Sequence, residues 1–150
     1  IPDEATCEVL PDRLPGITEI QAGSYVLMDT AYAKLDIPFE QAMWVLGTVI
    51  SRPNPVLCVT DSGHKAATED HGNPDVRDVE GASVMFLSDE HASITIPADS
   101  PIKVGDRIQL APSHIDPTIN LHDVFYALEG EKVVGVWPIA ARGYSHQRQV

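Results

Sequence analysis

Residues 42–51 read Ala-Met-Trp-Val-Leu-Gly-Thr-Val-Ile-Ser, and this run decides the fold class. The run is almost wholly apolar, rich in β-branched side chains, and followed directly by Arg52 and Pro53. A short apolar run that stops in this way fits a buried β-strand better than a short helix. A second run of β-forming residues, 56–60, begins after Pro55. We therefore expect the two runs to pair as a hairpin.

Further strand patterns recur at short intervals toward the C-terminus. They cover residues 82–87, 92–96, 106–110, 124–128 and 133–139, with turn residues between them at 101–105 and at Glu129-Gly130-Glu131. Short strands at this spacing predict a mainly β, antiparallel domain from about residue 37 onward. The polar residues 61–80 predict a long loop with one helical turn near Lys65 to Thr68, and the strand pattern ends at Ala140.

The N-terminal part of the chain has a weaker pattern. Residues 17–28 combine β-branched and apolar side chains around Gly23, which predicts a short strand, a turn and a second extended piece. Residues 30–36 fit one helical turn. The region should therefore be less regular than the β domain that follows.

Length, composition and charge exclude several classes of protein. A chain of 150 residues with 43% hydrophobic and 21% charged residues matches one soluble globular domain. No apolar run approaches the roughly 20 residues of a membrane span. The formal net charge of -12 would repel phosphate backbones and anionic lipids. We therefore expect neither nucleic acid nor membrane as a partner.

The two cysteines and the first residue bear on the compartment and on processing. Cys7 and Cys58 lie far apart without metal-ligand spacing, so they predict neither a disulfide framework nor a cysteine zinc site. A reducing cytoplasm is the expected location. The chain opens at Ile1 without the features of a secretory signal, and we expect an excised, processed or incompletely represented chain.

Residues 110–118 read Leu-Ala-Pro-Ser-His-Ile-Asp-Pro-Thr and hold the most informative candidate site. In an extended chain, side chains two residues apart point to the same side, so His114 and Asp116 should converge while Ile115 turns into the core. Pro117 favours the extended conformation of the residue before it. The pair is therefore a candidate clamp for one cation.

The chemistry of this pair indicates an open metal site. An imidazole and a carboxylate suit Zn, Mn or Mg, and two protein ligands leave coordination positions for water or substrate. The alternative is that the pattern arises by chance, with His114 hydrogen-bonded in a loop and Asp116 beginning an Asx turn. Spacing alone leaves both interpretations open.

Two other stretches contain residues that could bind or react. Gly23 and Ser24 could hold a phosphate, because glycine lets the backbone approach a ligand, although the dipeptide alone is more typical of a simple turn. The stretch 61–65 offers an aspartate, a histidine and Lys65, which could in principle form a Schiff base; a solvated strand exit is the alternative. The Glu90-His91 pair fits a turn between two strands. Three other histidines have no evident partner: His71, His122 and His146.

The order of five short motifs resembles one known family. The motifs are Thr18-Glu-Ile-Gln-Ala-Gly-Ser-Tyr-Val-Leu-Met-Asp29, Thr48-Val-Ile-Ser51, Asp61-Ser-Gly-His-Lys-Ala66, Leu87-Ser-Asp-Glu-His91, and Pro112-Ser-His-Ile-Asp-Pro-Thr118 with Val124-Phe-Tyr126. Each motif is weak alone, but in this order they resemble the D-threonine aldolase and D-serine dehydratase family across roughly residues 15–142.

The resemblance implies a pyridoxal-phosphate enzyme of fold type III. Residues 1–36 would be the last segment of an α/β (TIM-type) barrel, and residues 37–150 an alanine racemase-like antiparallel β domain. Gly23 and Ser24 would hold the cofactor phosphate, and His114 and Asp116 a divalent metal. The family's Schiff-base lysine lies in the upstream barrel, which this sequence lacks, and Lys65 does not match it.

The resemblance also implies a reaction and leaves alternatives open. The first expectation is an aldolase-like lyase that cleaves D-3-hydroxy amino acids to glycine and an aldehyde, as a cytoplasmic homodimer. D-serine dehydratases typically have cysteine at the position of Asp116, so the carboxylate favours the aldolase over β-elimination. A third possibility is a freestanding β module that binds a metal or small ligand without catalysis.

Overall fold

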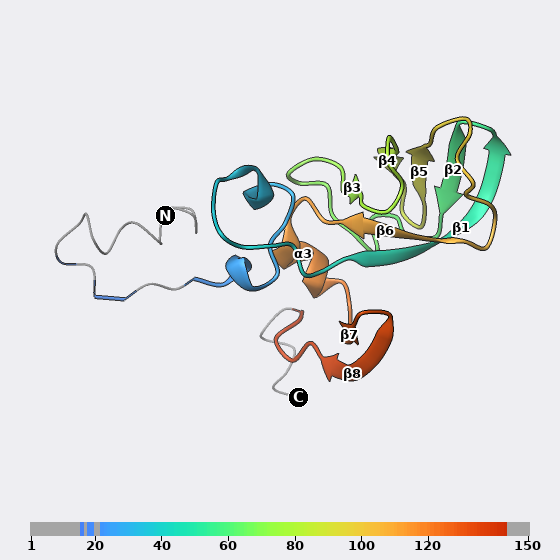
Figure 1. Cartoon of the computed structure of the whole chain (residues 1–150). Helices are drawn as coiled ribbons and strands as arrows, with labels where there is room; N and C mark the ends of the chain where they lie inside the picture. Colours follow the sequence, from blue (N-terminus) through green and yellow to red (C-terminus); the bar gives the residue numbers. More distant parts are fainter. Residues whose placement is uncertain (1–15, 17, 20–21, 144–150) are drawn as a thin grey trace.

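A computed structural model describes residues 16, 18–19 and 22–143 (Figure 1). The elements are the 3-10 turns η1 (Ser24–Val26) and η2 (Tyr32–Lys34), the strands β1 (Val45–Asn54), β2 (Leu57–Thr60), β3 (Asp75–Val76), β4 (Ser83–Leu87), β5 (Ala92–Thr95) and β6 (Arg107–Ala111), the helix α3 (Ile115–Asn120), and the strands β7 (Val124–Glu129) and β8 (Lys132–Pro138). Within these ranges, no helix has the length and apolar character needed to cross a bilayer. The strands expected from residue 42 onward are all present, and β3 is an addition that the sequence pattern did not indicate.

Six strands form one antiparallel sheet in the order β3-β6-β1-β2-β5-β4. The long strand β1 lies inside the sheet because its first half pairs with β6 and its second half pairs with β2. The two ends of the sheet are joined: Asn73, just before β3, donates hydrogen bonds to the carbonyl oxygens of Val84 (3.0 Å) and Met85 (3.2 Å) in β4. The sheet is therefore curved and nearly closed, which confirms the expected antiparallel β domain.

Apolar side chains on one face of this sheet form the core. On β1, Val45 and Val49 are buried whereas Leu46 and Ile50 are exposed, as the two-residue repeat of a strand requires. The rest of the core comprises Cys58, Ala67, Val84, Leu87, Ala92, Ile94, Ile96, Ile108 and Leu110. The strand and hairpin expected from residues 42–60 are confirmed, although β1 begins later than expected and continues through Pro53.

The segment around Gly23 differs from the extended conformation expected of it. The backbone amides of Leu27 and Met28 donate to the carbonyl oxygen of Ser24, at 3.1 and 2.7 Å, and close the turn η1. These local bonds need no partner strand, so the strand prediction is wrong for the described residues of this segment. Residues 17 and 20–21 lie outside them. The turn η2 confirms the helical turn expected within residues 30–36.

The chain enters a helix soon after β6, where an extended conformation is expected. His114 is extended (φ -145°, ψ 118°) and forms the N-cap of α3, whereas Asp116 lies in the first helical turn. Pro117 is tolerated because the first amides of a helix have no acceptor within it. The bias of proline against a helical predecessor is thus overcome at Asp116.

β7 and β8 form a separate two-stranded ribbon, which Figure 1 shows below α3 and away from the six-stranded sheet. Gly130 has a φ of 61° at the tip, so the hairpin expected at this position is confirmed. Large apolar side chains on the ribbon are 51 to 66% exposed: Tyr126, Leu128, Val133, Val134, Val136 and Trp137. The ribbon has strand geometry but contributes little to the core.

Candidate functional site

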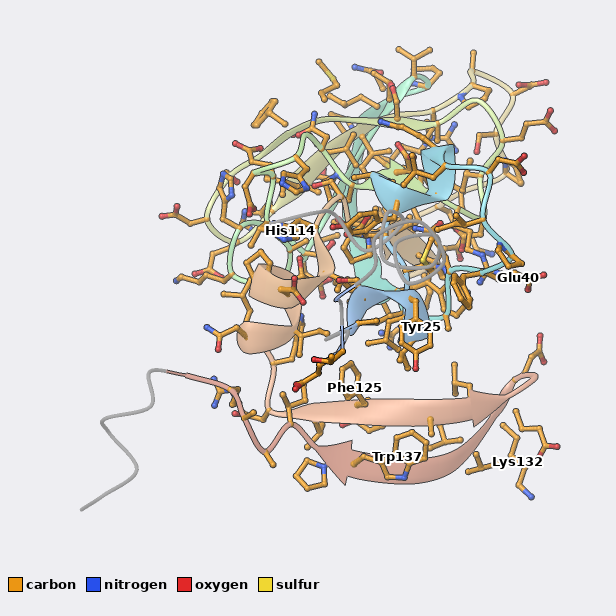
Figure 2. All side chains as sticks on the ribbon, turned by 90° about the vertical axis from the view of Figure 1, so that its left-hand side faces the viewer. Tyr25, Glu40, His114, Phe125, Lys132 and Trp137 are labelled. Carbon is orange, nitrogen blue, oxygen red and sulfur yellow. The ribbon has the colours of Figure 1, made fainter. Side chains whose placement is uncertain are left out.

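His114 and Asp116 lie together at the start of α3. His114 Nε2 is 3.5 Å from Asp116 Oδ2. The His114 side chain is 26% exposed and the Asp116 side chain is 70% exposed, so the imidazole is partly buried whereas the carboxylate faces solvent. Figure 2 shows His114 at the end of α3 farther from the ribbon.

The two side chains converge through a helix start rather than through the expected extended chain. The backbone is extended at His114 and helical from Ile115 onward, and this change of direction brings Asp116 back toward the imidazole. Ile115 is buried at 1% exposure, as expected for the residue between them. The predicted backbone geometry is wrong, while the juxtaposition of the two side chains is present.

Two residues from a distant loop complete the surroundings of His114. Asp70 Oδ2 lies 2.8 Å from His114 Nδ1, and the ring of His71 stacks on that of His114 with centroids 4.1 Å apart. Hydrogen bonds from the side chains of Thr68 and His114 lower the pKa of the Asp70 carboxyl. Sequence reasoning missed both residues, because 44 positions separate Asp70 from His114.

The donor set at His114 and Asp116 fits a divalent metal ion. The Asp70 carboxylate only accepts hydrogen bonds, so it favours the proton on Nδ1 and leaves a lone pair on Nε2. Metal–ligand distances of about 2.0–2.2 Å allow one ion to reach two donor atoms separated by 3.5 Å. In the described part of the chain, no group of three or more His, Cys, Asp or Glu side chains could hold a metal. Two protein donors would therefore leave coordination positions for other ligands.

Gly23 and Ser24 lie at the beginning of η1. Ser24 is buried at 8% exposure, and Gly23 is its N-cap with φ -137° and ψ -54°. A small residue beside a hydroxyl and backbone amides has donor chemistry that fits a phosphate. In addition, the hydroxyl of Ser113, next to His114, is buried without a hydrogen-bond partner among the described residues, so a polar ligand could satisfy it.

The buried carboxylate of Asp29 connects the η1 segment to the start of α3. Its Oδ1 accepts hydrogen bonds from the amides of Ala31 (3.0 Å) and Tyr32 (2.9 Å), and its Oδ2 accepts one from Ile115 (3.4 Å). A backbone bond from Thr30 to the carbonyl oxygen of Pro112, 3.0 Å long, lies beside it. The two candidate binding segments are therefore fastened together, although they are far apart in sequence.

The loop after β2 makes structural contacts. Asp61 Oδ1 accepts a hydrogen bond from the amide of Thr48 at 2.6 Å, which agrees with a strand exit. Lys65 forms an exposed ion pair with Glu90, and the hydrogen bond from its amine to Glu90 raises the pKa of Lys65. A charged amine is a poor Schiff-base nucleophile.

The remaining candidate histidines have separate positions. His91 follows Glu90 in the connection between β4 and β5, as expected. His122 Nε2 lies 2.8 Å from the carbonyl oxygen of Ala66. His146 lies outside the described residues. The contact of His122 is thus with the backbone of the loop that approaches His114.

Comparison with known proteins identifies the family of this domain. The model of the putative serine dehydratase domain matches residues 42–128. The chain belongs to this family. The match runs from just before β1 into β7 and includes His114 and Asp116, and it confirms the family predicted from the five motifs.

Named relatives of this family member include aldolases, which are carbon–carbon lyases. The chain is 37% identical to a D-threonine aldolase of an Arthrobacter species over 140 residues, which is 89% of this chain and 37% of that protein. It is also 37% identical to the 3-hydroxy-D-aspartate aldolase of Paracoccus denitrificans over 134 residues, which is 83% of this chain and 34% of the relative. The chain therefore spans about a third of the length of these aldolases.

Solved structures confirm the fold class. The D-threonine aldolase of Filomicrobium marinum superposes with a TM-score of 0.77 at 39% identity, over 81% of this chain and 34% of that one. An alanine racemase-like protein of Idiomarina loihiensis gives a TM-score of 0.73 at 24% identity, over 82% of this chain and 38% of that one. The second likeness, at low identity, supports the alanine racemase-like fold of the β domain.

Proposed function

We propose that this chain is the C-terminal part of a D-threonine aldolase-like lyase that depends on pyridoxal phosphate and a divalent metal. The proposed reaction cleaves D-3-hydroxy amino acids to glycine and an aldehyde. The observation that carries the proposal is the pair of donor atoms, His114 Nε2 and Asp116 Oδ2, that face each other at 3.5 Å. The names of the aldolase relatives support the choice of reaction.

His114 and Asp116 would hold the metal ion, and their nitrogen and oxygen donors suit Mn, Mg or Zn. A bound divalent ion lowers the pKa of an alcohol that it coordinates. Because the protein supplies only two donors, the site has room for the β-hydroxyl of the substrate. The two side chains would thereby orient the carbon atom whose bond to Cα is cleaved.

Gly23 and Ser24 would hold the phosphate of pyridoxal phosphate through backbone amides and the serine hydroxyl. The cofactor supplies an electron sink for cleavage of the Cα–Cβ bond. We place its covalent lysine in an upstream barrel, with residues 1–36 as the last barrel segment and residues 37–150 as the β domain. For the whole enzyme we propose a cytoplasmic homodimer, by analogy with the family.

The metal assignment is tested by His114→Ala and Asp116→Ala in the complete enzyme. Each change is expected to abolish metal-dependent release of glycine from D-threonine, because one donor cannot hold the ion, and to leave the cofactor absorbance nearly unchanged. The control is Asp99→Ala, which removes the same charge from an exposed residue of the link between β5 and β6. Activity of either site variant that is equal with and without a chelator would contradict the assignment.

A second candidate reaction is β-elimination, which gives a 2-oxo acid and ammonia. The D-threo-3-hydroxyaspartate dehydratase of Delftia sp. HT23 shares the fold, with a TM-score of 0.77 at 23% identity. A D-threo-3-hydroxyaspartate dehydratase was also solved with alanine in place of a histidine, and in a metal-free form with alanine in place of a cysteine two positions later. This chain has a carboxylate at Asp116, and we infer cleavage rather than elimination from it.

The products formed from D-threonine distinguish these two reactions. Cleavage releases glycine, whereas elimination releases 2-oxobutanoate. Chromatography of the reaction mixture measures both products at once. If 2-oxobutanoate is the sole product, the aldolase proposal is wrong.

The third candidate is a β module that binds a metal or small ligand without catalysis. An uncharacterised protein of Mycobacterium tuberculosis supports it. The two chains are 31% identical over 122 residues, and the aligned region covers 90% of that protein. Relatives of this domain thus occur in short proteins. Visible absorption spectra of the purified chain, with and without added pyridoxal phosphate, report whether any lysine in it binds the cofactor covalently.

A further inference from the structure

We propose that Asp70 is a positioning residue for His114. Its carboxylate fixes the proton on Nδ1, so that Nε2 keeps its lone pair and faces Asp116, ready for a divalent cation. This inference rests on the metal site of the proposed function. It assigns the loop between β2 and β3 a role in that site.

The contact between Asp70 and His114 has the geometry of a good hydrogen bond. Asp70 Oδ2 and His114 Nδ1 are 2.8 Å apart, which is a usual length when one partner is charged. A carboxylate has no proton to donate, so the imidazole must donate from Nδ1. In metal sites, a carboxylate on the second ring nitrogen commonly sets the tautomer and orientation of a ligating histidine.

The next residue in the same loop fixes the face of the imidazole. The rings of His71 and His114 are stacked with centroids 4.1 Å apart and planes inclined by only 6°. Asp70 holds the edge of the ring and His71 covers one face. Tilting the imidazole would break the stacking on His71, and a 180° flip would break the hydrogen bond to Asp70, so the direction of Nε2 is set by the loop.

The loop is itself attached to α3 through the buried residue Thr118. The Thr118 hydroxyl donates to the carbonyl oxygen of His114 at 2.8 Å and accepts a bond from the amide of Thr68 at 3.3 Å. A second contact joins His122 Nε2 to the carbonyl oxygen of Ala66 at 2.8 Å. Asp70 therefore approaches His114 from a loop that is held at Thr118 in α3 and at His122 just after it.

The two ring nitrogens of His114 have unequal environments, which favour a ligand position at Nε2. Nδ1 lies within hydrogen-bond distance of Asp70 Oδ2, at 2.8 Å. By contrast, the distance from Nε2 to Asp116 Oδ2 is 3.5 Å, which is long for a hydrogen bond, and the Asp116 side chain is 70% exposed. Nδ1 thus has a close carboxylate partner, whereas Nε2 has space for a cation between it and Asp116.

Calorimetric titration of the full chain with Mn²⁺ tests this role. Asp70→Ala is expected to weaken Mn²⁺ binding about 10- to 100-fold, the usual effect of removing the partner of a ligating histidine. Asp99→Ala removes the same charge from an exposed residue and is expected to change the affinity less than about twofold. Circular dichroism of each variant verifies that it is folded.

The same titration separates failure of this inference from failure of the proposed metal site. His114→Ala should abolish Mn²⁺ binding at the site. Unchanged binding in His114→Ala would reject the metal site itself. Loss of binding in His114→Ala together with wild-type affinity in Asp70→Ala would reject the role of Asp70 alone.

Nitrogen NMR of the unsubstituted, metal-free chain gives a readout that does not depend on a folded Asp70 variant. At a pH where the His114 ring is neutral, its proton is expected on Nδ1 rather than on Nε2, with the resonances assigned by their absence from His114→Ala. A neutral ring that carries its proton on Nε2 would overturn the inference. In folded Asp70→Ala, the preference for Nδ1 should decrease.

Discussion

The six-stranded sheet and the β7–β8 ribbon are both antiparallel and rich in apolar residues, yet they use those residues differently. In the sheet, Ile94, Ile108 and Leu110 are fully buried, because the curved sheet encloses its own core. In the ribbon, Val134 and Trp137 are 53 and 61% exposed. Figure 2 shows the ribbon alongside the rest of the domain, with Phe125 on the nearer side and Trp137 farther away. A strand pattern thus predicts conformation without predicting burial.

The ribbon is closed at its open end by contacts between its flanking residues, and it is attached to α3 by the amide of Gly143, which donates to Asn120 Oδ1 at 2.5 Å. The amide of Ile139 donates to the carbonyl oxygen of Asp123 at 2.9 Å, and Arg142 forms an ion pair with the Asp123 carboxylate. The tip at Gly130 lies at the opposite end of the two strands. Since an isolated two-stranded hairpin is marginal in water, these attachments should matter more for the ribbon than its exposed apolar surface does.

The largest effect is expected from a cavity inside the sheet. Ile108→Ala removes buried methyl and methylene groups that the packed core cannot replace, and should lower the free energy of unfolding by about 2–5 kcal/mol. Urea denaturation followed by circular dichroism measures it. A loss below about 1 kcal/mol would remove the contrast between sheet and ribbon.

A smaller effect, on reactivity, is expected at Cys58 in β2. The thiol is completely buried, and burial raises its pKa, so little thiolate is present at neutral pH. In a Cys7→Ser background, labelling of Cys58 by a thiol reagent should be much slower than labelling of the unfolded chain. The rate should increase as the pH rises and should increase further in Ile108→Ala. Labelling of the native chain at the rate of a free thiol would show that the core is open.

The smallest effect is expected on the ribbon. Val134→Thr keeps the shape of a side chain that is 53% exposed, and should change the free energy of unfolding by no more than about 0.5 kcal/mol. The measurement is the same urea denaturation, repeated at two protein concentrations. A loss as large as that of Ile108→Ala would mean that this side of the ribbon is covered in the folded protein.

The sequence predicts the strands well because their signal is local and repeated. The alternation from Val45 to Val49 follows directly from the geometry of a half-buried strand, and Gly130 supplies the left-handed backbone conformation that the ribbon tip requires. The errors lie in short segments. At η1 and at the start of α3, single backbone hydrogen bonds and one buried carboxylate determine the conformation, and neither leaves a periodic pattern.

The candidate site could be predicted only in part for a related reason. His114 and Asp116 are two positions apart, so their juxtaposition follows from almost any local backbone. Asp70 and His71 reach His114 only after the loop has folded against α3, and nothing in their own neighbourhood indicates that contact. The requirement for glycine at Gly63 likewise depends on a contact that forms only in the folded chain. A Cβ at this position would lie 2.1 Å from the carbonyl oxygen of Ser88.

The buried carboxylate of Asp29 has a thermodynamic consequence for the two proposed ligands. It accepts hydrogen bonds from Tyr32, in the segment after η1, and from Ile115, at the start of α3. If a ligand at Gly23 and Ser24 displaced this backbone, the displacement would reach the start of α3 through Asp29 and would alter the affinity for an ion at His114. Such linkage is reciprocal: each ligand would change the dissociation constant of the other by the same factor.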